Sequence, residues 1–259
     1  MPEVTLVEAI NLALARAMED DQNVVVFGED VGVNGGVFRA TVGLQQRFGS
    51  ERVFDTPLAE LLISGLCVGM AAQGLKPVGE IQFMGFIYPC IDQLVNHASR
   101  LRNRTQGRLS CPMVLRTPHG SGIRAPEHHS ESTEAMLAHI PGLRVVIPSS
   151  PERAYGLLLA AIRDPDPDPV VFLEPTRIYR AARGEVEDND GILAARSPAA
   201  TSARPVSRSS LRSKLSELSH QGNGLVRPPG GSLRLRRLVA RLRHATMSAP
   251  RSLSGGKRT

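Results

Sequence analysis

Short apolar runs alternate with segments of helical periodicity along the first 180 residues, and this alternation limits the fold more than any other feature of the chain. The runs expected to form strands are 23–27, 77–83, 112–117, 143–147 and 170–173. The segments expected to form helices are 6–18, 58–74, 88–104, 132–139 and 152–163. Strands that alternate with helices of this length predict an α/β fold with a doubly wound, mostly parallel sheet.

The amino-terminal residues predict a helix start and argue against a targeting segment. Thr5 precedes Glu8 by three residues, the spacing of a capping box. No basic segment followed by an apolar run is present, and no run approaches the roughly 18–20 apolar residues that span a bilayer. The three cysteines form no Cys-x-x-Cys pair. We therefore expect a cytoplasmic protein without a membrane segment.

The charge balance changes at about Arg180. Residues 181–259 hold 15 Lys and Arg against 5 Asp and Glu, a net charge of +10. Subtracting these from the chain's 31 and 25 leaves 16 and 20, so residues 1–180 carry a net charge of −4. We expect an α/β domain at 1–180, followed by a disordered, low-complexity Arg/Ser-rich tail at 181–259. The basic balance belongs to the tail, so it gives no reason to expect nucleic acid on the domain.

Polar residues with chemical potential gather where predicted strands end. Glu29, Gln82 and the His128–His129 loop follow three of the apolar runs, and ligands of doubly wound sheets lie at such carboxyl ends. Glu60 opens a predicted helix; it is either a first-turn glutamate that stabilises the helix dipole or an acid that donates a proton to a heterocycle.

Two other groups have a structural and a functional interpretation. Phe86 and Tyr88 suit core packing or a flat wall for a bound aromatic ring. The basic residues Arg100, Arg102 and Arg104 suit the solvated end of a helix better than a nucleic-acid patch, since no aromatic ladder flanks them.

Five segments in order resemble one enzyme family. They are GEDVG at 28–32, GGVFRAT at 35–41, VFDTPLAE at 53–60, EIQF at 80–83 and RAPEHHSES at 124–132. Together they are similar to the beta subunit of thiamine-diphosphate-dependent 2-oxo acid dehydrogenases, such as the pyruvate and branched-chain enzymes. The resemblance extends from residue 2 to about 180 and implies the transketolase-like, pyrimidine-binding type of domain.

The resemblance implies two catalytic residues. Glu60 matches the glutamate that protonates the aminopyrimidine ring of thiamine diphosphate. His129 matches the histidine linked to reductive acylation of a lipoyl group. The implied reaction is oxidative decarboxylation of pyruvate or a branched-chain 2-oxo acid, with acyl transfer to the lipoyl group of a dihydrolipoamide acyltransferase.

The resemblance also implies a shared cofactor site. Phe86 matches the aromatic residue that packs on the aminopyrimidine, Leu58 and Gln82 line the same pocket, and Glu29 matches a carboxylate near the pyrimidine. The chain lacks the Gly-Asp-Gly segment through which thiamine enzymes hold Mg²⁺ and the diphosphate. In the family the alpha subunit of an α2β2 tetramer supplies it, so this chain is expected to hold half a site and no metal.

The chain departs from the family after Arg180, where a second α/β domain is expected. We hypothesise that the tail is an out-of-frame translation of that domain, since 28 of the 31 basic residues are Arg, as GC-rich coding produces. The hypothesis fails if no shifted reading frame encodes such a domain. A genuine basic tail that binds nucleic acid or an acidic partner is the alternative. For the whole chain, the alternatives are an acetoin dehydrogenase beta subunit and an inactive truncated pseudo-subunit.

Overall fold

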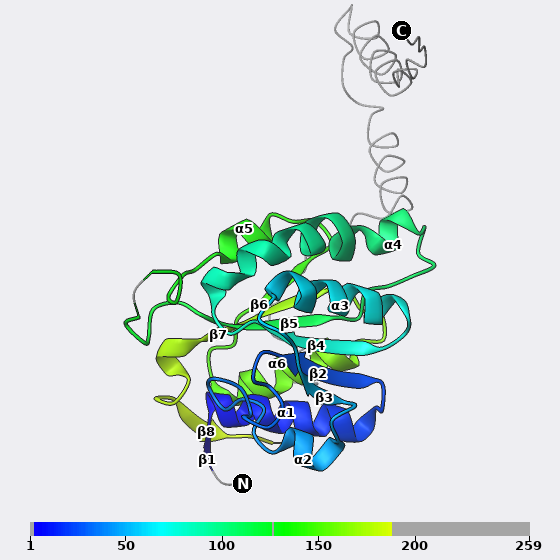
Figure 1. Cartoon of the computed structure of the whole chain (residues 1–259). Coiled ribbons are helices and arrows are strands. Elements are labelled where there is room, and N and C mark those ends of the chain that lie inside the picture. The colour runs from blue at the N-terminus through cyan, green and yellow to red at the C-terminus, as the bar shows by residue number, and fades with distance from the viewer. Residues whose placement is uncertain (1–2, 126, 188–259) are drawn as a thin grey trace, which may run out of the picture. The chain divides into compact units, whose positions relative to one another are not determined.

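The computed structural model describes residues 3–125 and 127–187 (Figure 1). The predictions for the tail at 188–259 lie outside the described residues. Within the described part, no helix is long and apolar enough to cross a bilayer.

A six-stranded, wholly parallel sheet forms the centre of the domain. Its strand order is β3-β2-β4-β5-β7-β6. The strands are β2 (Val24–Gly28), β3 (Val53–Asp55), β4 (Lys76–Glu80), β5 (Val114–His119), β6 (Arg144–Val146) and β7 (Val170–Pro175). Four of these strands, β2, β4, β5 and β7, are buried along almost their whole length, as expected for a parallel sheet that is covered on both faces.

Helices cover both faces of the sheet, so the predicted doubly wound α/β fold is confirmed (Figure 1). On one face lie α1 (Leu6–Asp20), α2 (Leu44–Phe48) and α6 (Pro151–Arg163). On the other lie α3 (Glu60–Ala72), α5 (Glu134–Ala138) and the helical turns of 84–104. The two apolar layers form separate cores on opposite sides of the sheet.

The predicted capping box is confirmed at the start of α1. The Thr5 hydroxyl accepts a hydrogen bond from the Glu8 amide, and the Glu8 carboxylate accepts one from the Thr5 amide at 2.7 Å. Two of the amides at the helix start are thereby satisfied, so α1 begins where the sequence predicted.

The helical segment predicted for 88–104 is confirmed, but it begins earlier, at Met84, and its geometry is irregular. It consists of a 3-10 helix at Met84–Cys90, a π-helix at Gln93–His97, a 3-10 turn at Ala98–Arg100 and the short α4 at Leu101–Arg104. Pro89 lies inside the first of these turns and has no amide to donate, which interrupts a regular α-helical ladder. The irregular start brings Phe86 to the carboxyl edge of the sheet.

The folded part extends beyond the predicted boundary at Arg180. Residues of β8 (Arg183–Glu185) pair antiparallel with β1 (Glu3–Thr5), with Val4 opposite Gly184. Neither short strand was predicted, because a segment of three residues is too short to show the alternating pattern of a strand. This pairing joins the two ends of the described domain.

The arginine run has a partner that the sequence did not suggest. Arg102 forms ion pairs with Asp166 at 2.7 Å and Asp168 at 3.0 Å, both in the loop 164–169, whose sequence is a threefold Asp-Pro repeat. Arg100 and Arg104 donate to the backbone carbonyls of 95 and 96. Arg102 therefore anchors the Asp-Pro loop and does not form a free basic patch.

A charged cluster is buried inside the sheet, and no sequence pattern indicated it. The Arg116 guanidinium bonds to Glu80 at 2.8 Å and to Glu174 at 2.7 and 3.1 Å. The Tyr179 hydroxyl also donates to Glu174. Arg116 and Glu174 are fully buried. These four residues, the Arg116 cluster, link β4, β5 and β7.

Candidate active site

The strand order creates a switch point between β2 and β4. These strands are neighbours in the sheet, yet the chain leaves β2 toward the face of α2 and leaves β4 toward the opposite face. A crevice outside the carboxyl ends of two such strands is the usual ligand position in this architecture. Glu29 follows β2 and Gln82 follows β4, so both lie at that position.

Glu29 is a buried carboxyl group with an unsatisfied oxygen. The residue is only 6% exposed, and its Oε1 atom has no hydrogen-bond partner among the described residues. Burial raises the pKa of Glu29, and the nearby charge of Glu60 raises it further, while a hydrogen bond from the Ala59 backbone opposes the shift. A buried, unsatisfied polar atom is rare in a native fold and is a feature of functional sites.

Glu60 lies beside Glu29 at the first residue of α3. Its backbone carbonyl accepts hydrogen bonds from the Cys90 thiol at 3.2 Å and the Ser64 hydroxyl at 3.1 Å. The Cys90 contact ties α3 to the 3-10 helix that carries Phe86. Burial raises the pKa of Cys90 to about 12, so this thiol is protonated and is not a nucleophile.

Gln82 connects the two strand ends. Its side-chain amide donates to the Glu29 carbonyl at 3.4 Å and to the Asp30 carboxylate at 3.3 Å. Asp30 itself adopts a left-handed backbone conformation, with φ of 57°. The amide therefore holds the strained turn that presents Glu29.

Phe86 and His129 meet in an aromatic cluster with Phe83. The His129 ring lies 4.7 Å from Phe83 and 5.2 Å from Phe86, both edge to face, and Phe83 lies 5.8 Å from Phe86. The His129 Nδ1 atom lies 2.8 Å from the carbonyl of Glu127. The cluster joins the predicted catalytic histidine to the predicted aromatic wall. Sequence reasoning missed Phe83, which it treated only as the end of a strand.

The loop that carries His129 packs against the backbone of Gly85. A Cβ atom at this glycine would lie 1.9 Å from the His128 carbonyl oxygen, so no larger residue fits without movement. His128 adopts a left-handed conformation, with φ of 66°, and its Nδ1 lies 3.2 Å from Glu131, which also bonds to Tyr88. These contacts hold 127–132, the histidine loop, over the Met84–Cys90 turn.

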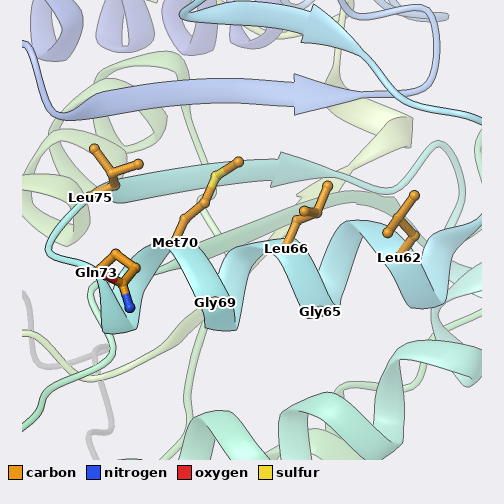
Figure 2. A pocket seen from close by; sticks show the side chains of 7 residues that line it. All are labelled: Leu62, Gly65, Leu66, Gly69, Met70, Gln73 and Leu75. Carbon is orange, nitrogen blue, oxygen red and sulfur yellow. The ribbon is translucent and has the colours of Figure 1, made fainter.

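Leu58 differs from the other predicted site residues because its side chain is 82% exposed. It begins an exposed apolar stretch that includes Leu61 and Leu62. Further along α3, a groove of about 350 Å³ is lined by Leu62, Gly65, Leu66, Gly69, Met70, Gln73 and Leu75. Figure 2 shows Leu62, Leu66 and Met70 on the same side of α3. Most of the groove is apolar, and it runs along α3, the helix that begins at Glu60.

Acidic residues at such a site could also serve as metal ligands. No group of three or more His, Cys, Asp or Glu among the described residues could hold a metal ion. Glu29 and Glu60 are two carboxyl groups close enough for the charge of Glu60 to raise the pKa of Glu29.

Replacing Glu29 with glutamine should stabilise the isolated chain, and increasingly so at higher pH. The pKa of Glu29 in the folded chain lies above the unfolded value of about 4.3. The folded form therefore holds the proton more tightly, and wild-type stability falls as the pH rises through this interval. Denaturant unfolding between pH 4 and 8 should show this fall in the wild type and a weaker one in Glu29→Gln. Parallel profiles would contradict it, and Glu51→Gln, at an exposed site, is the control.

The comparisons with known proteins agree with this geometry. A family model described as "Transketolase, pyrimidine binding domain" matches residues 2–182. The chain belongs to this family. The match spans all six strands of the parallel sheet and the candidate site, and it ends just before β8.

Several curated relatives carry one name. "Pyruvate dehydrogenase E1 component subunit beta" of Acholeplasma laidlawii is 62% identical over 186 residues, which are 72% of this chain and 56% of that protein. The protein of the same name from Bacillus subtilis (strain 168) is 52% identical over 190 residues, 73% of this chain and 58% of that protein. The predicted resemblance to such beta subunits is confirmed. The chain spans a little over half the length of these relatives.

A solved structure shares the fold. It is titled "Split gene transketolase, inactive beta4 tetramer", and it matches with a TM-score of 0.52 and 17% sequence identity. The match covers 66% of this chain and 50% of that chain. At this identity the likeness supports the transketolase-like fold alone.

Proposed function

We propose that the domain forms the pyrimidine-binding half of the active site of a 2-oxo acid dehydrogenase, as its beta subunit. The observation that carries the proposal is the buried Glu29 carboxyl, one oxygen of which has no partner in the described part of the chain, beside Glu60 at the switch point. Pyruvate is the substrate we propose first, because relatives at 52–62% identity bear that name.

The residues at the site fit thiamine diphosphate. A buried carboxyl oxygen without a partner among the described residues suits a nitrogen of an aminopyrimidine ring, and the Phe83, Phe86 and His129 cluster offers apolar ring surface. When bound, thiamine diphosphate supplies the electron sink that decarboxylation of a 2-oxo acid requires. The sequence lacks the Gly-Asp-Gly segment through which thiamine enzymes hold the metal and the diphosphate, so we assign Mg²⁺ and the diphosphate to an alpha subunit.

Each site residue then has a distinct task. Glu60 donates a proton to a ring nitrogen and recovers it, and Glu29 keeps a second carboxyl close by, with its raised pKa favouring a retained proton. Gln82 holds the turn of Glu29 and Asp30 in position. Phe86 packs against the pyrimidine ring. His129 takes part in the transfer of the acyl group to a lipoyl group carried by an acyltransferase. Leu58 contacts the cofactor only once a partner subunit covers it.

The exposed face of α3 supports a partner on this side of the site. Leu58, Leu61 and Leu62 are 82%, 49% and 42% exposed. Leu62 also lines the apolar groove, which extends along the helix to Leu75 (Figure 2). Exposed apolar surface of this kind marks an interaction site. Because it adjoins Glu60, we propose that the alpha subunit docks here and completes the cofactor site.

The proposal is tested by mixing the chain with the alpha subunit of a relative and measuring CO₂ release from 2-oxo acids. We expect release from pyruvate that depends on both subunits and on thiamine diphosphate. We also expect weaker assembly than that of the full-length relative, because the chain matches 56% of its length. A stable, fully active α2β2 tetramer would refute the expected assembly defect.

The same assay separates the alternatives. Preference for branched-chain 2-oxo acids would change the substrate but keep the reaction. Turnover of acetoin in place of 2-oxo acids would identify an acetoin dehydrogenase subunit. Assembly with thiamine diphosphate bound but without any turnover would indicate an inactive pseudo-subunit.

A further inference from the structure

Four polar side-chain atoms at the base of the histidine loop are buried and unpartnered within the described residues. They are His119 Nδ1, Ser130 Oγ, Thr133 Oγ1 and Glu134 Oε2. Most buried polar groups in native proteins have a partner, so four in one short stretch require an explanation. Ser130 lies in the histidine loop, and the other three residues lie outside the residues assigned to the candidate active site.

His119 and Glu134 occupy the two ends of this stretch and face each other. His119 is the last residue of β5 and Glu134 is the first residue of α5. The His119 Nδ1 and Glu134 Oε2 atoms are 3.8 Å apart, slightly too far for a hydrogen bond. The backbone brings the ends together independently, because the Gly120 amide donates to the Glu131 carbonyl at 3.0 Å.

The His119 end is held firmly by the sheet. His119 pairs with Pro175 of β7, and the Thr176 hydroxyl donates to the carbonyls of His119 at 3.3 Å and Gly120 at 3.1 Å. The side chain of His119 is 13% exposed and that of Glu134 is 40% exposed. Closing the gap by about 1 Å therefore requires movement of Glu134 and the end of the loop, not of the sheet.

We propose that His119 and Glu134 form a proton-dependent clamp that fixes the base of the histidine loop. A neutral imidazole that is protonated at Nε2 has no proton on Nδ1, so Nδ1 cannot donate a hydrogen bond to a carboxylate. A protonated imidazole donates from Nδ1, and a charge-assisted bond closes to about 2.7–2.9 Å. The clamp positions the segment that carries His128 and His129 against Gly85 and the aromatic cluster. It does not depend on the proposed reaction.

The surrounding charges leave Glu134 as the partner of His119. Burial lowers the pKa of His119, and Glu134 is the group whose charge raises it.

The other charged groups near His119 have partners or positions of their own. Glu131 of the loop is bonded to Tyr88 and lies near His128. Glu174 of β7 is bonded to Arg116 and Tyr179. Arg177, after β7, has its backbone next to Gly122. The clamp thus closes as the pH falls below the ordinary imidazole value of about 6.5.

The experiment follows the full chain by NMR and by amide hydrogen exchange between pH 5 and 8. In the wild type, protection of amides in 120–125 and 127–133, corrected for intrinsic exchange, should rise roughly two- to fivefold as His119 is protonated. Glu134→Gln should lower the pKa of His119 and abolish the rise. Glu127→Gln, which removes an exposed carboxylate of the same loop, should change neither.

His119→Phe distinguishes a clamp from simple packing. This variant keeps a planar ring and leaves His128 and His129 in place, so any remaining pH dependence comes from titratable groups other than residue 119. Loss of packing alone would reduce protection equally at every pH, whereas loss of the clamp removes only the increase at low pH. An unchanged His119 pKa in Glu134→Gln, or an undiminished pH-dependent rise in His119→Phe, would overturn the proposal.

Discussion

Replacing Arg116 with methionine should lower the free energy of unfolding by about 3–5 kcal/mol, measured by denaturant titration at neutral pH. Arg116 is fully buried and is bonded to Glu80 and Glu174. Methionine fills a similar volume but leaves two carboxyl groups in the interior without a counter-charge. The desolvation of these carboxylates is then uncompensated, and this accounts for the loss.

Two companion variants separate charge from packing. Arg116→Met combined with Glu80→Gln and Glu174→Gln should recover part of the lost stability, because it removes the buried charges that Arg116 neutralised. Arg102→Met should cost only on the order of 1 kcal/mol, since its ion pairs with Asp166 and Asp168 lie partly in solvent. Equal losses for Arg102→Met and Arg116→Met would contradict the burial argument.

The loss in Arg116→Met should also depend on pH. Burial already raises the pKa of Glu80 in the intact cluster, while Arg116 opposes that shift. Without the guanidinium, the folded-state pKa rises further above the unfolded value of about 4.3. Folding then favours the protonated carboxyl, so the destabilisation should shrink as the pH falls toward 5. A loss that stays constant from pH 5 to pH 8 would point to packing as its cause.

Glu60→Gln should reduce turnover by about 10²–10⁴-fold if Glu60 has the proposed acid–base role. Glutamine keeps the shape of the side chain and its place in the first turn of α3 but cannot exchange a proton. The backbone contacts of Glu60 with Cys90 and Ser64 are unaffected. We therefore expect the variant to fold and to bind its partner normally while catalysis is lost.

The measurement is sharpest in a chimera in which residues 2–182 replace the matching part of the Acholeplasma laidlawii beta subunit. The chimera restores the part of the relative that this chain does not match, so turnover no longer depends on weak assembly. Glu51→Gln, an exposed glutamate before β3, should retain turnover. A Glu60→Gln chimera with more than a tenth of wild-type activity would refute the proposed role of Glu60.

The active-site prediction depended on two kinds of information. The position of Glu29 and Gln82 at strand ends followed from the apolar runs alone, and the strand order confirms that both lie at the switch point. The assignment of Phe86 and His129 came from the family resemblance, because a single aromatic or histidine in a loop carries no such information. Their contact with each other and with Phe83 is visible only in the folded chain.

The sequence by itself determined the α/β class, the start of α1 and the strand-end placement of the candidate residues, because these follow from local periodicity and capping. Only the tertiary structure decided which charges share the interior. Arg116, Glu80 and Glu174 lie on three different strands, so their pairing depends on the strand order and register. The same holds for His119 and Glu134. They face each other because the loop between them folds back over the carboxyl end of β5. Contacts between residues distant in the chain depend on the packing of the whole domain, and no local pattern encodes them.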